Sequence, residues 1–357
     1  MKLPHRPAQA ATWNAADYAA NSAVQQSWAR ELIARLHLRG DEQVLDVGCG
    51  DGKVTAELAR AVPRGHVLGV DASPEMIAFA RKAFPASKIS NLNFQIGDAR
   101  EIGQVVRPGS NSKKLALNAR SEVGMNTPPP PHKPEDKLEL NGSSPSPRPS
   151  PPGEGETLPA SWQSQTSGGS RVQGVNYAGN SFAQGEGERG GMFDLVFSNA
   201  ALHWVDDHEA ILRGAAAVLK PGGRLVVSCG GKGNAHAVFL ALRPEMRLQR
   251  WRGFFRKMPA PYFFHAPADY EKWLPKFGFK TNLLKLAPKD ATYAGADGFA
   301  TWLRTTWLPY LQRVPENLRE EFIAAVTRRY LAKHPADAEG KVHVRMVRLE
   351  IDAVRVG

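Results

Sequence analysis

Short apolar runs and longer periodic segments follow one another along most of this chain. Runs rich in Val, Leu and Phe predict strands, and segments whose apolar residues recur every three or four positions predict helices. The predicted strands cover 43–47, 66–71, 91–99, 193–200 and 224–230, and the helices among them cover 53–62, 73–84 and 208–219. Because strands and helices alternate, the pattern predicts an α/β fold whose sheet is mostly parallel.

The two ends of the pattern add helices and further strands. Residues 13–38 predict one or two helices before the sheet, and a helix at 267–276 leads to a predicted strand at 279–287. Residues 296–334 predict two or three amphipathic helices, and 341–356 alternate apolar with polar residues, which is typical of an antiparallel strand. Helices placed between two sheet strands in this way fit a lid that folds over the strand ends.

A segment rich in Pro, Gly and Ser interrupts the pattern between the third and fourth predicted strands. Residues 104–191 contain PPPP, SPSPRPSPPGEGE and GEGERGG, and too few apolar residues to form a core. We therefore expect a long disordered insertion, and a tether for a partner is the alternative. The pattern thus divides the chain into an N-terminal helical cap (1–38), a core in two segments (39–103 and 192–295) and the insertion (104–191). A helical lid (296–340) and a final core strand (341–357) complete it.

Composition and charge narrow the class of protein. The 357 residues are 42% hydrophobic, which suffices for a sizeable core, and the sequence shows no signal-peptide-like start and no membrane-spanning apolar run. The two cysteines, Cys49 and Cys229, fit a reducing cytoplasm and lack metal-site spacing, so we expect a cytoplasmic protein without a metal. The net charge of +11, densest at 243–257 and 327–333, fits nucleic acid, an acidic protein, an anionic small molecule, or simply a solvated surface.

The turn after the first predicted strand carries the most specific motif. VLDVGCGDG at 44–52 runs from a buried strand into a turn that contains Gly48 and Gly50, and the next strand ends in Asp71. Such glycines let the backbone approach a ligand closely, and an acid after the second strand can bind two ribose hydroxyls. The motif departs from the GxGxxG of phosphate binders, and Asp46 would repel a pyrophosphate but attract an ammonium group. S-adenosylmethionine, which has an amino acid end, a ribose, an adenine and no phosphate, fits these residues.

Several strand ends taken together are similar to those of a known family. The glycine turn, Asp71, Asp98 and SNAALHW at 198–204 resemble the class I S-adenosylmethionine-dependent methyltransferases. Within this family, the chain is most similar to the trans-aconitate methyltransferases and related small-molecule carboxyl methyltransferases. The segments that carry this likeness are WNAADY, SPEMI, SNAALHWVDDHEAIL, PYFFHAPADYEKWL and TWLRTTWLPYL. The resemblance implies a doubly wound, seven-stranded Rossmann-like sheet with an antiparallel last strand. It also implies methyl transfer by in-line displacement, to an oxygen of a small, anionic carboxylic acid.

The resemblance further implies roles for single residues in cofactor binding. The positions that match the family's pattern are Tyr18, Asp46, Gly48, Gly50, Asp71, Ala72, Asp98, Ala99 and Asn199. Asp46, Gly48 and Gly50 would hold the methionine end, and Asn199 would contact the same portion through its backbone. Asp71 would bind the ribose hydroxyls with Ala72 against the adenine, and Asp98 and Ala99 would read the adenine edge. The alternatives are that Asp71 caps the turn before Ser73 and that Asp98 caps a helix starting at Arg100.

The acceptor side rests on fewer residues. Tyr18-x6-Gln25 and Trp204 resemble the arrangement in juvenile hormone acid and salicylic acid carboxyl methyltransferases, where a glutamine amide and an indole N–H hold the substrate carboxylate. Both groups donate hydrogen bonds without adding a charge. His203 is the candidate base, which a carboxylate acceptor would not need. The alternatives are packing roles for Trp204 and His203 and a solvent-facing Gln25.

Other functions remain open at this stage. The basic charge favours a methyltransferase of RNA or DNA, although the chain has no Asn/Asp-Pro-Pro-aromatic turn after the fourth strand. A module that binds the cofactor without catalysis and an aminopropyl transferase are further alternatives, the latter without an acidic signature for a polyamine. For an anionic substrate, Arg304 and Arg345 are candidate clamps on charge and location alone.

Overall fold

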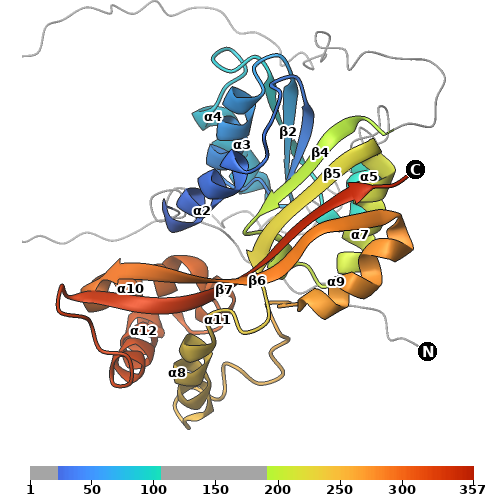
Figure 1. Ribbon diagram of the computed structural model, residues 1–357. Helices are drawn as coiled ribbons and strands as arrows, with labels where there is room; N and C mark the ends of the chain where they lie inside the picture. Colours follow the sequence, from blue (N-terminus) through green and yellow to red (C-terminus); the bar gives the residue numbers. More distant parts are fainter. Residues whose placement is uncertain (1–22, 106–190) are drawn as a thin grey trace, which may run out of the picture. The chain divides into compact units, whose positions relative to one another are not determined.

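Seven strands form one sheet in the order β3-β2-β1-β4-β5-β7-β6 (Figure 1). The computed structural model describes residues 23–105 and 191–357. Its strands are β1 Gln43–Val47, β2 His66–Asp71, β3 Leu92–Ile96, β4 Phe193–Asn199, β5 Leu219–Gly230, β6 Phe279–Ala294 and β7 Lys341–Arg355. The first five strands run parallel, and β7 is antiparallel to both β5 and β6. The carboxyl ends of β1, β2, β4 and β5 therefore meet at one edge of the sheet.

Helices pack on both faces of this sheet. They are α2 Ala23–Ala34, α3 Lys53–Ala61, α4 Pro74–Ala83, α5 Ile102–Val105, α7 His208–Val218, α8 His236–Arg247, α9 Pro267–Trp273, α10 Gly295–Thr306, α11 Leu308–Leu311 and α12 Glu316–Leu331. Short 3₁₀ turns are η1 Ala99–Glu101, η2 Leu202–Trp204 and η3 Leu274–Phe277. Alternate strand residues face opposite ways, so Leu45 and Val47 pack with α5, α7 and α9, whereas Val44 packs with α2, α3 and α4 (Figure 1). This two-sided packing confirms the predicted doubly wound α/β sheet with an antiparallel last strand.

Local chemistry explains where two of the central helices begin. At α4, the Ser73 hydroxyl accepts a hydrogen bond from the backbone N–H of Met76 at 3.2 Å, and Pro74 occupies the first turn. At α7, the Asp207 carboxylate accepts from the backbone N–H of Ala210 at 2.9 Å. Both caps satisfy a backbone donor that the first helical turn leaves without a partner.

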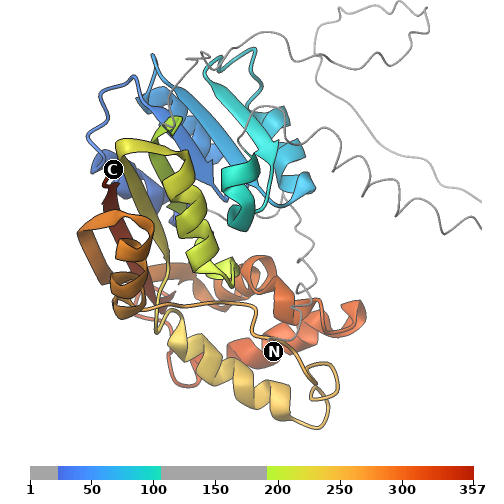
Figure 2. The same ribbon diagram turned by 90° about the vertical axis from the view of Figure 1, so that its right-hand side faces the viewer.

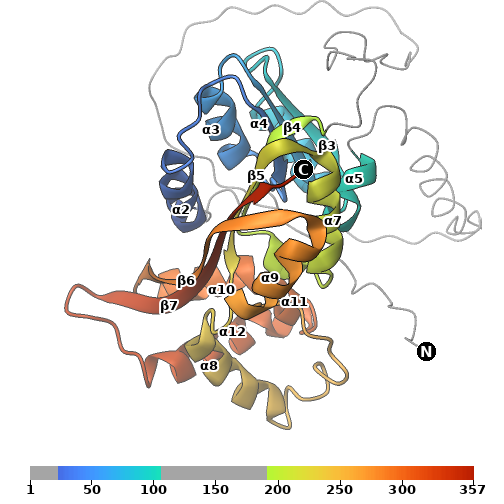
Figure 3. The ribbon, with the colours of Figure 1, turned by 45° about the vertical axis from the view of Figure 1, so that its right-hand side comes forward.

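The strands β6 and β7 extend beyond the rest of the sheet as a two-stranded ribbon. Strand β5 pairs with β7 only over Arg348–Val354, whereas β6 pairs with β7 along nearly its whole length. Val342, Val344 and Met346 on this ribbon share one buried cluster with residues of α8, α10, α11 and α12. These helices therefore form a subdomain on the ribbon (Figure 2, Figure 3).

The structure corrects several predicted boundaries. Strand β5 begins at Leu219 and takes in the Pro-Gly-Gly segment that predicts a turn, because its pairing with β4 starts at Phe193 and then shifts register. Strand β6 continues to Ala294 because β7 pairs with it that far. Helix α8 lies where no helix is predicted.

Two expectations concern residues that the structure does not describe or that it describes only in part. The expected insertion lies almost wholly outside the described residues, although α5 continues two residues into it, to the buried Val105. The division of the chain into a cap, a core, an insertion and a lid remains a prediction. Among the described helices, none is long and apolar enough to cross a membrane.

Candidate active site

The glycine turn after β1 brings three strand ends together. Gly48 and Gly50 have φ angles of 77° and 53°, a conformation that favours glycine. The backbone N–H of Gly48 donates to the Val70 carbonyl at 2.7 Å, which ties the turn to β2. A Cβ atom added at Gly48 would lie 2.1 Å from the Cβ atom of Ala201, in the segment after β4. Gly48 is thus required both by its backbone conformation and by the close approach of this segment.

Asp46 places a carboxylate inside the sheet just before this turn. Its side chain is 2% exposed, and its Oδ2 atom accepts a hydrogen bond from the Thr55 hydroxyl at 2.7 Å. Burial, together with the nearby Asp71 carboxylate, outweighs the Thr55 hydrogen bond and raises the pKa of Asp46 to about 7. The negative charge of Asp46 is therefore poorly stabilised in the protein alone.

Asp71 ends β2 and bridges two backbone segments. One carboxylate oxygen accepts from the backbone N–H of Gly50 at 2.9 Å, and the other accepts from the backbone N–H of Ser73 at 2.9 Å. Burial raises the pKa of Asp71 despite these hydrogen bonds. Each carboxylate oxygen has a second lone pair, so Asp71 can cap the turn and still accept hydrogen bonds from a ligand.

These two carboxylates test which kind of ligand the strand ends fit. Within residues 23–105 and 191–357, neither Asp46 nor Asp71 has a cationic side chain as a partner. A buried anion without a counter-charge favours a cationic ligand, and Asp71 adds acceptors for hydroxyl groups. An ammonium group and a ribose fit this pair of residues, whereas a phosphate would be repelled by both.

The end of β3 is less open to a ligand than the sequence predicts. Asp98 caps η1 through the backbone N–H of Arg100 at 2.8 Å and also pairs with the Arg100 guanidinium. Burial alone would raise the pKa of Asp98, but these bonds outweigh it and the pKa is lowered. Ala99 begins η1 beside the core, and Ala72 is exposed after β2. A role for Asp98 in reading the adenine edge would have to share the carboxylate with Arg100.

The end of β4 is held by a buried cation from β7. Arg348 is 4% exposed, and its guanidinium donates to Asn199 Oδ1 at 3.0 Å and to Ser228 Oγ at 3.1 Å. It also lies over the Trp28 ring, 5.5 Å from the centroid. The residue that follows β4, Ala200, has a left-handed φ of 58°, which is strained for a residue with a Cβ atom. Arg348, in the middle of β7, thereby ties the ends of β4 and β5 together around Asn199.

The turn η2 carries the two candidate acceptor-side residues, His203 and Trp204. The backbone N–H of Gly230 donates to His203 Nδ1 at 3.2 Å, which leaves the ring proton on Nε2. Burial and the Arg348 charge lower the pKa of His203 to about 3, so the ring is neutral at neutral pH. The Trp204 ring lies 4.8 Å from the Tyr262 ring, centroid to centroid, and 5.6 Å from that of His203.

Comparison with known proteins decides the family of this fold and site. The family model described as a methyltransferase domain matches residues 20–284. This chain belongs to that methyltransferase family. The trans-aconitate 2-methyltransferase of Deinococcus radiodurans is 25% identical over 91% of this chain and 93% of its own length. An uncharacterised methyltransferase of Schizosaccharomyces pombe is 24% identical over 76% of this chain and 72% of its own.

One solved structure aligns with most of this chain at low sequence identity. The crystal structure of a putative methyltransferase from Bacillus halodurans is 14% identical, covers 93% of this chain and all of its own, and has a TM-score of 0.49. The family match and the distant trans-aconitate 2-methyltransferase relatives confirm the expected class: this chain is a class I S-adenosylmethionine-dependent methyltransferase.

The remaining predicted site residues of this methyltransferase fall into distinct groups. Tyr18 lies outside the described residues, and Gln25 lies in α2 with its side chain outside them. Arg304 is exposed and forms a two-pronged ion pair with Glu320, at 2.7 and 2.6 Å. The described residues contain no cluster of three or more His, Cys, Asp or Glu that would hold a metal ion. The remaining candidate clamp, Arg345, is an exposed residue of β7.

The sequence analysis missed Arg348, although a signal for it exists. In β7 the inward positions alternate through Val342, Val344 and Met346, and the next inward position is Arg348. An arginine in register with three apolar residues indicates a buried charge, and a buried charge requires partners. With that signal, the sequence would predict Arg348 as the cation near the site, in place of Arg304 and Arg345.

Proposed function

We propose that this methyltransferase transfers the methyl group of S-adenosylmethionine to a carboxylate oxygen of a small organic acid. The observation that carries the proposal is the state of His203, the imidazole on the same turn as Trp204. Its Nδ1 atom is occupied by the Gly230 N–H, and its pKa of about 3 keeps the ring neutral. A ring in that state donates from Nε2 and takes up no proton near neutral pH. The favoured acceptor is therefore one that arrives already ionised, and a carboxylate meets this condition at neutral pH.

The surroundings of Trp204 add a second line of support. The indole N–H and the His203 Nε2–H are both uncharged donors, and such donors hold a carboxylate without lowering its nucleophilicity as strongly as a cation would. The Gln25 amide, in the role that the family resemblance gives it, would add a third uncharged donor. The distant relatives named trans-aconitate 2-methyltransferase agree with an acid as acceptor.

The proposed mechanism divides binding from alignment. The cofactor supplies a methyl group bound to a positively charged sulfur. Asp46 would bind the ammonium group and Asp71 the ribose hydroxyls, at strand ends that the Gly50 and Ser73 backbone holds rigid. Trp204 and Gln25 would orient the acceptor carboxylate for in-line attack. Alignment and exclusion of water are then the enzyme's main contributions, worth up to roughly 7–11 kcal/mol.

The test uses the chemistry of the product. The full-length protein is incubated with methyl-labelled S-adenosylmethionine and separate pools of organic acids, amines, phenols and total RNA. A methyl ester of a carboxylic acid releases labelled methanol on mild alkaline treatment, whereas methyl groups on nitrogen, phenols or bases remain attached. Base-labile label in the acid pool alone is the expected result. Base-stable label in RNA, or cofactor binding without transfer to any pool, contradicts the proposal and supports the corresponding rival function.

A pair of variants assigns the carboxylate-binding role. Trp204→Phe keeps an aromatic ring but removes the N–H donor, and we expect KM for the acid to rise roughly 10-fold with little change in cofactor affinity. Trp273→Phe, on α9 beside His265, is the matched control and should leave KM unchanged. Equal effects of both substitutions would show that the Trp204 indole serves packing rather than substrate binding.

A further inference from the structure

A continuous set of aromatic rings adjoins the turn that carries Trp204. Tyr262 lies 4.8 Å from Trp204, and Phe264 stacks on Tyr262 at 5.5 Å, all between ring centroids. Phe239, from α8, lies 6.1 Å from Phe264 and 4.9 Å from Trp307, which lies between α10 and α11. We call Trp204, Phe239, Tyr262, Phe264 and Trp307 the aromatic wall. It runs from the candidate acceptor position into the helical subdomain.

The wall carries no charge of its own. The Tyr262 hydroxyl donates to the Thr306 carbonyl at 3.1 Å, so its polar end is already satisfied by the helical subdomain. Arg243 is exposed, and its guanidinium lies over the Phe239 ring at 5.5 Å. Arg348 lies near enough for its charge to lower the pKa of His203, on the same turn as Trp204. Arg348 donates to Asn199 and Ser228. A polycarboxylate placed along these rings would lose water without gaining ionic partners from the wall.

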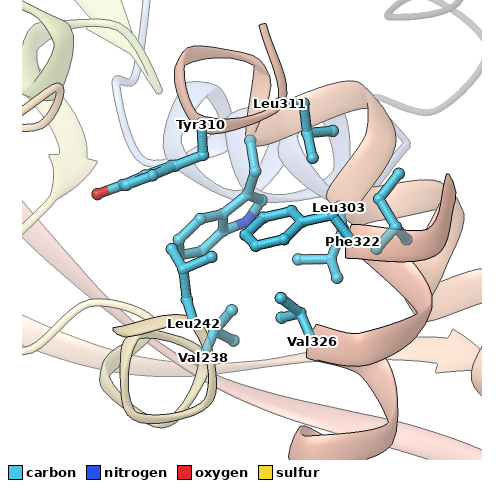
Figure 4. Close-up of a pocket in the computed structure, with 9 residues that line it drawn as sticks. Val238, Leu242, Leu303, Tyr310, Leu311, Phe322 and Val326 are labelled. Atoms are coloured by element: carbon cyan, nitrogen blue, oxygen red, sulfur yellow. The ribbon is translucent and has the colours of Figure 1, made fainter. Parts of the chain in front are cut away.

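A small apolar cavity lies within the helical subdomain and shares Trp307 with the wall (Figure 4). Val238 and Leu242 from α8 and Val326 from α12 converge on it (Figure 4). Trp307, a member of the wall, also lines it, beside Tyr310. Its other lining residues are Leu303, Leu311, Phe322 and Ile323. This void has room for about one water molecule, so a methylene added to its lining would fill it and press on the Trp307 ring.

We infer that the acceptor of this enzyme is a monocarboxylic acid with an apolar alkyl or aromatic body, which lies along the aromatic wall while its carboxylate faces Trp204. This inference rests on the proposed carboxyl methyl transfer and specifies its substrate class. It separates this chain from its distant relatives named trans-aconitate 2-methyltransferase, whose name indicates a polycarboxylate acceptor.

The decisive experiment measures kcat/KM for a graded series of acids with the full-length protein. Acetate, butyrate, hexanoate and decanoate test length, cinnamate tests an aromatic body, and trans-aconitate and citrate test multiple charges. Burial of one methylene against apolar surface predicts that kcat/KM rises about fourfold per added methylene until the wall is covered. The polycarboxylates should be at least about 100-fold poorer than decanoate or cinnamate, since additional carboxylates would be desolvated without partners.

The outcomes distinguish a failure of this inference from a failure of the proposed function. Preference for trans-aconitate or citrate, or a rate independent of chain length, overturns the inference and leaves carboxyl methyl transfer intact. Transfer to no acid of the series, combined with transfer to RNA or an amine, overturns the proposed function and this inference with it.

Two variants locate the effect on the wall and the cavity. Phe239→Leu removes one ring of the wall with little loss of volume, and it should lower kcat/KM for cinnamate about 10-fold more than kcat/KM for acetate. Phe277→Leu, at a partly buried ring beside Arg213, is the control for a general loss of packing. Val326→Leu adds one methylene to the cavity and should move the optimum toward shorter acids. Loss of acetate and cinnamate turnover in equal proportion would show that the wall has a structural role only.

Discussion

The Asp71 carboxylate accepts a hydrogen bond from the backbone N–H of Gly50 at 2.9 Å, and this contact joins the end of β2 to the turn after β1. A single side chain thus shapes the turn and presents acceptors to a ligand. The same contact makes the alternative interpretations of Asp71, a turn cap and a ribose ligand, compatible with one another.

Replacement of Asp71 tests this double role. In Asp71→Asn, the amide NH₂ group would face one of two backbone donors, Gly50 or Ser73, so one hydrogen bond is lost and a ribose acceptor disappears. We expect affinity for S-adenosylhomocysteine to fall roughly 10- to 100-fold by calorimetry. Asp41→Asn, at an exposed carboxylate beside Arg39, is the control. Unchanged affinity in Asp71→Asn would exclude this residue from the cofactor site.

The raised pKa of Asp46 predicts that cofactor binding depends on pH. In the free protein burial raises this pKa to about 7, and a bound ammonium group would favour the carboxylate and lower it again. Affinity should therefore increase as the pH rises from about 6 to about 8 and level off above, by up to about 10-fold per pH unit below the pKa. Calorimetry across this range measures the effect, and Asp46→Asn should abolish the pH dependence together with most of the affinity.

The same residue predicts an opposite effect on the stability of the free protein. A folded-state pKa above the unfolded one penalises the fold as the pH rises through the interval from about 4 to about 7, and the penalty is complete above it. Asp46→Asn removes the penalty, so its melting temperature without cofactor should exceed that of the natural sequence more at pH 8 than at pH 5. A variant that is less stable at pH 8 would show that the charge of Asp46 is well compensated in the fold.

Two glycines with nearly the same φ angle form a matched pair. Gly48 has φ 77° and no room for a Cβ atom, whereas Gly222 has φ 76° and no atom within 4 Å of that position. Gly222→Ala should cost only the conformational strain, about 1–2 kcal/mol. Gly48→Ala should cost more by denaturant unfolding and should also weaken cofactor binding, because Ala201 and the β4 loop must move. Equal costs would mean that the Ala201 contact relaxes freely.

The two arginines Arg348 and Arg304 differ in burial and should differ in consequence. Arg348→Met removes a hydrogen-bond donor from Asn199 and from the Oγ atom of the buried Ser228, so it should destabilise the protein by about 3 kcal/mol or more. Arg304→Met breaks an exposed pair with Glu320 and should change the stability by less than about 1 kcal/mol. A large rise in KM for the acid in Arg304→Met would show that Arg304 binds the substrate carboxylate, as the sequence suggested.

Removal of His203 distinguishes a base from a donor. His203→Asn keeps a donor at the turn, and if His203 takes no proton during turnover, kcat should fall less than about 10-fold with an unchanged pH profile. Loss of a general base would instead cost roughly 100- to 10,000-fold. Fixed-time assays between pH 5 and pH 9 measure both the fall in kcat and its pH profile.

The parallel half of the fold follows from local pattern because each strand and helix there carries its own signal. Ser73 and Pro74 mark a helix start, and the glycine turn marks the end of β1. The proposed cofactor side of the site shares this origin, since in parallel sheets the carboxyl ends of successive strands meet at one edge. The sequence therefore predicts the region around Asp46 and Asp71 before any coordinates are known.

The helical subdomain and its contacts resist prediction for a physical reason. Helix α8 contains Pro244, which argues against a helix locally, yet Val238, Ala241 and Leu242 gain burial in the cluster shared with α12. Long-range pairing with β7 likewise extends β6 far past its apolar run. The aromatic wall is assembled from segments far apart in the chain, so its rings are recognisable individually but their contacts are not.

Asp46 and Asp71, two nearby carboxylates without a cationic side-chain partner among the described residues, have a consequence for the life of this enzyme in the cell. A ligand that binds only the folded form stabilises it by RT ln(1 + [L]/Kd), so the folded population depends on the supply of that ligand. The abundance of this enzyme should accordingly fall when the methionine cycle is starved, and a preparation stripped of its nucleoside during purification should be the form most prone to proteolysis.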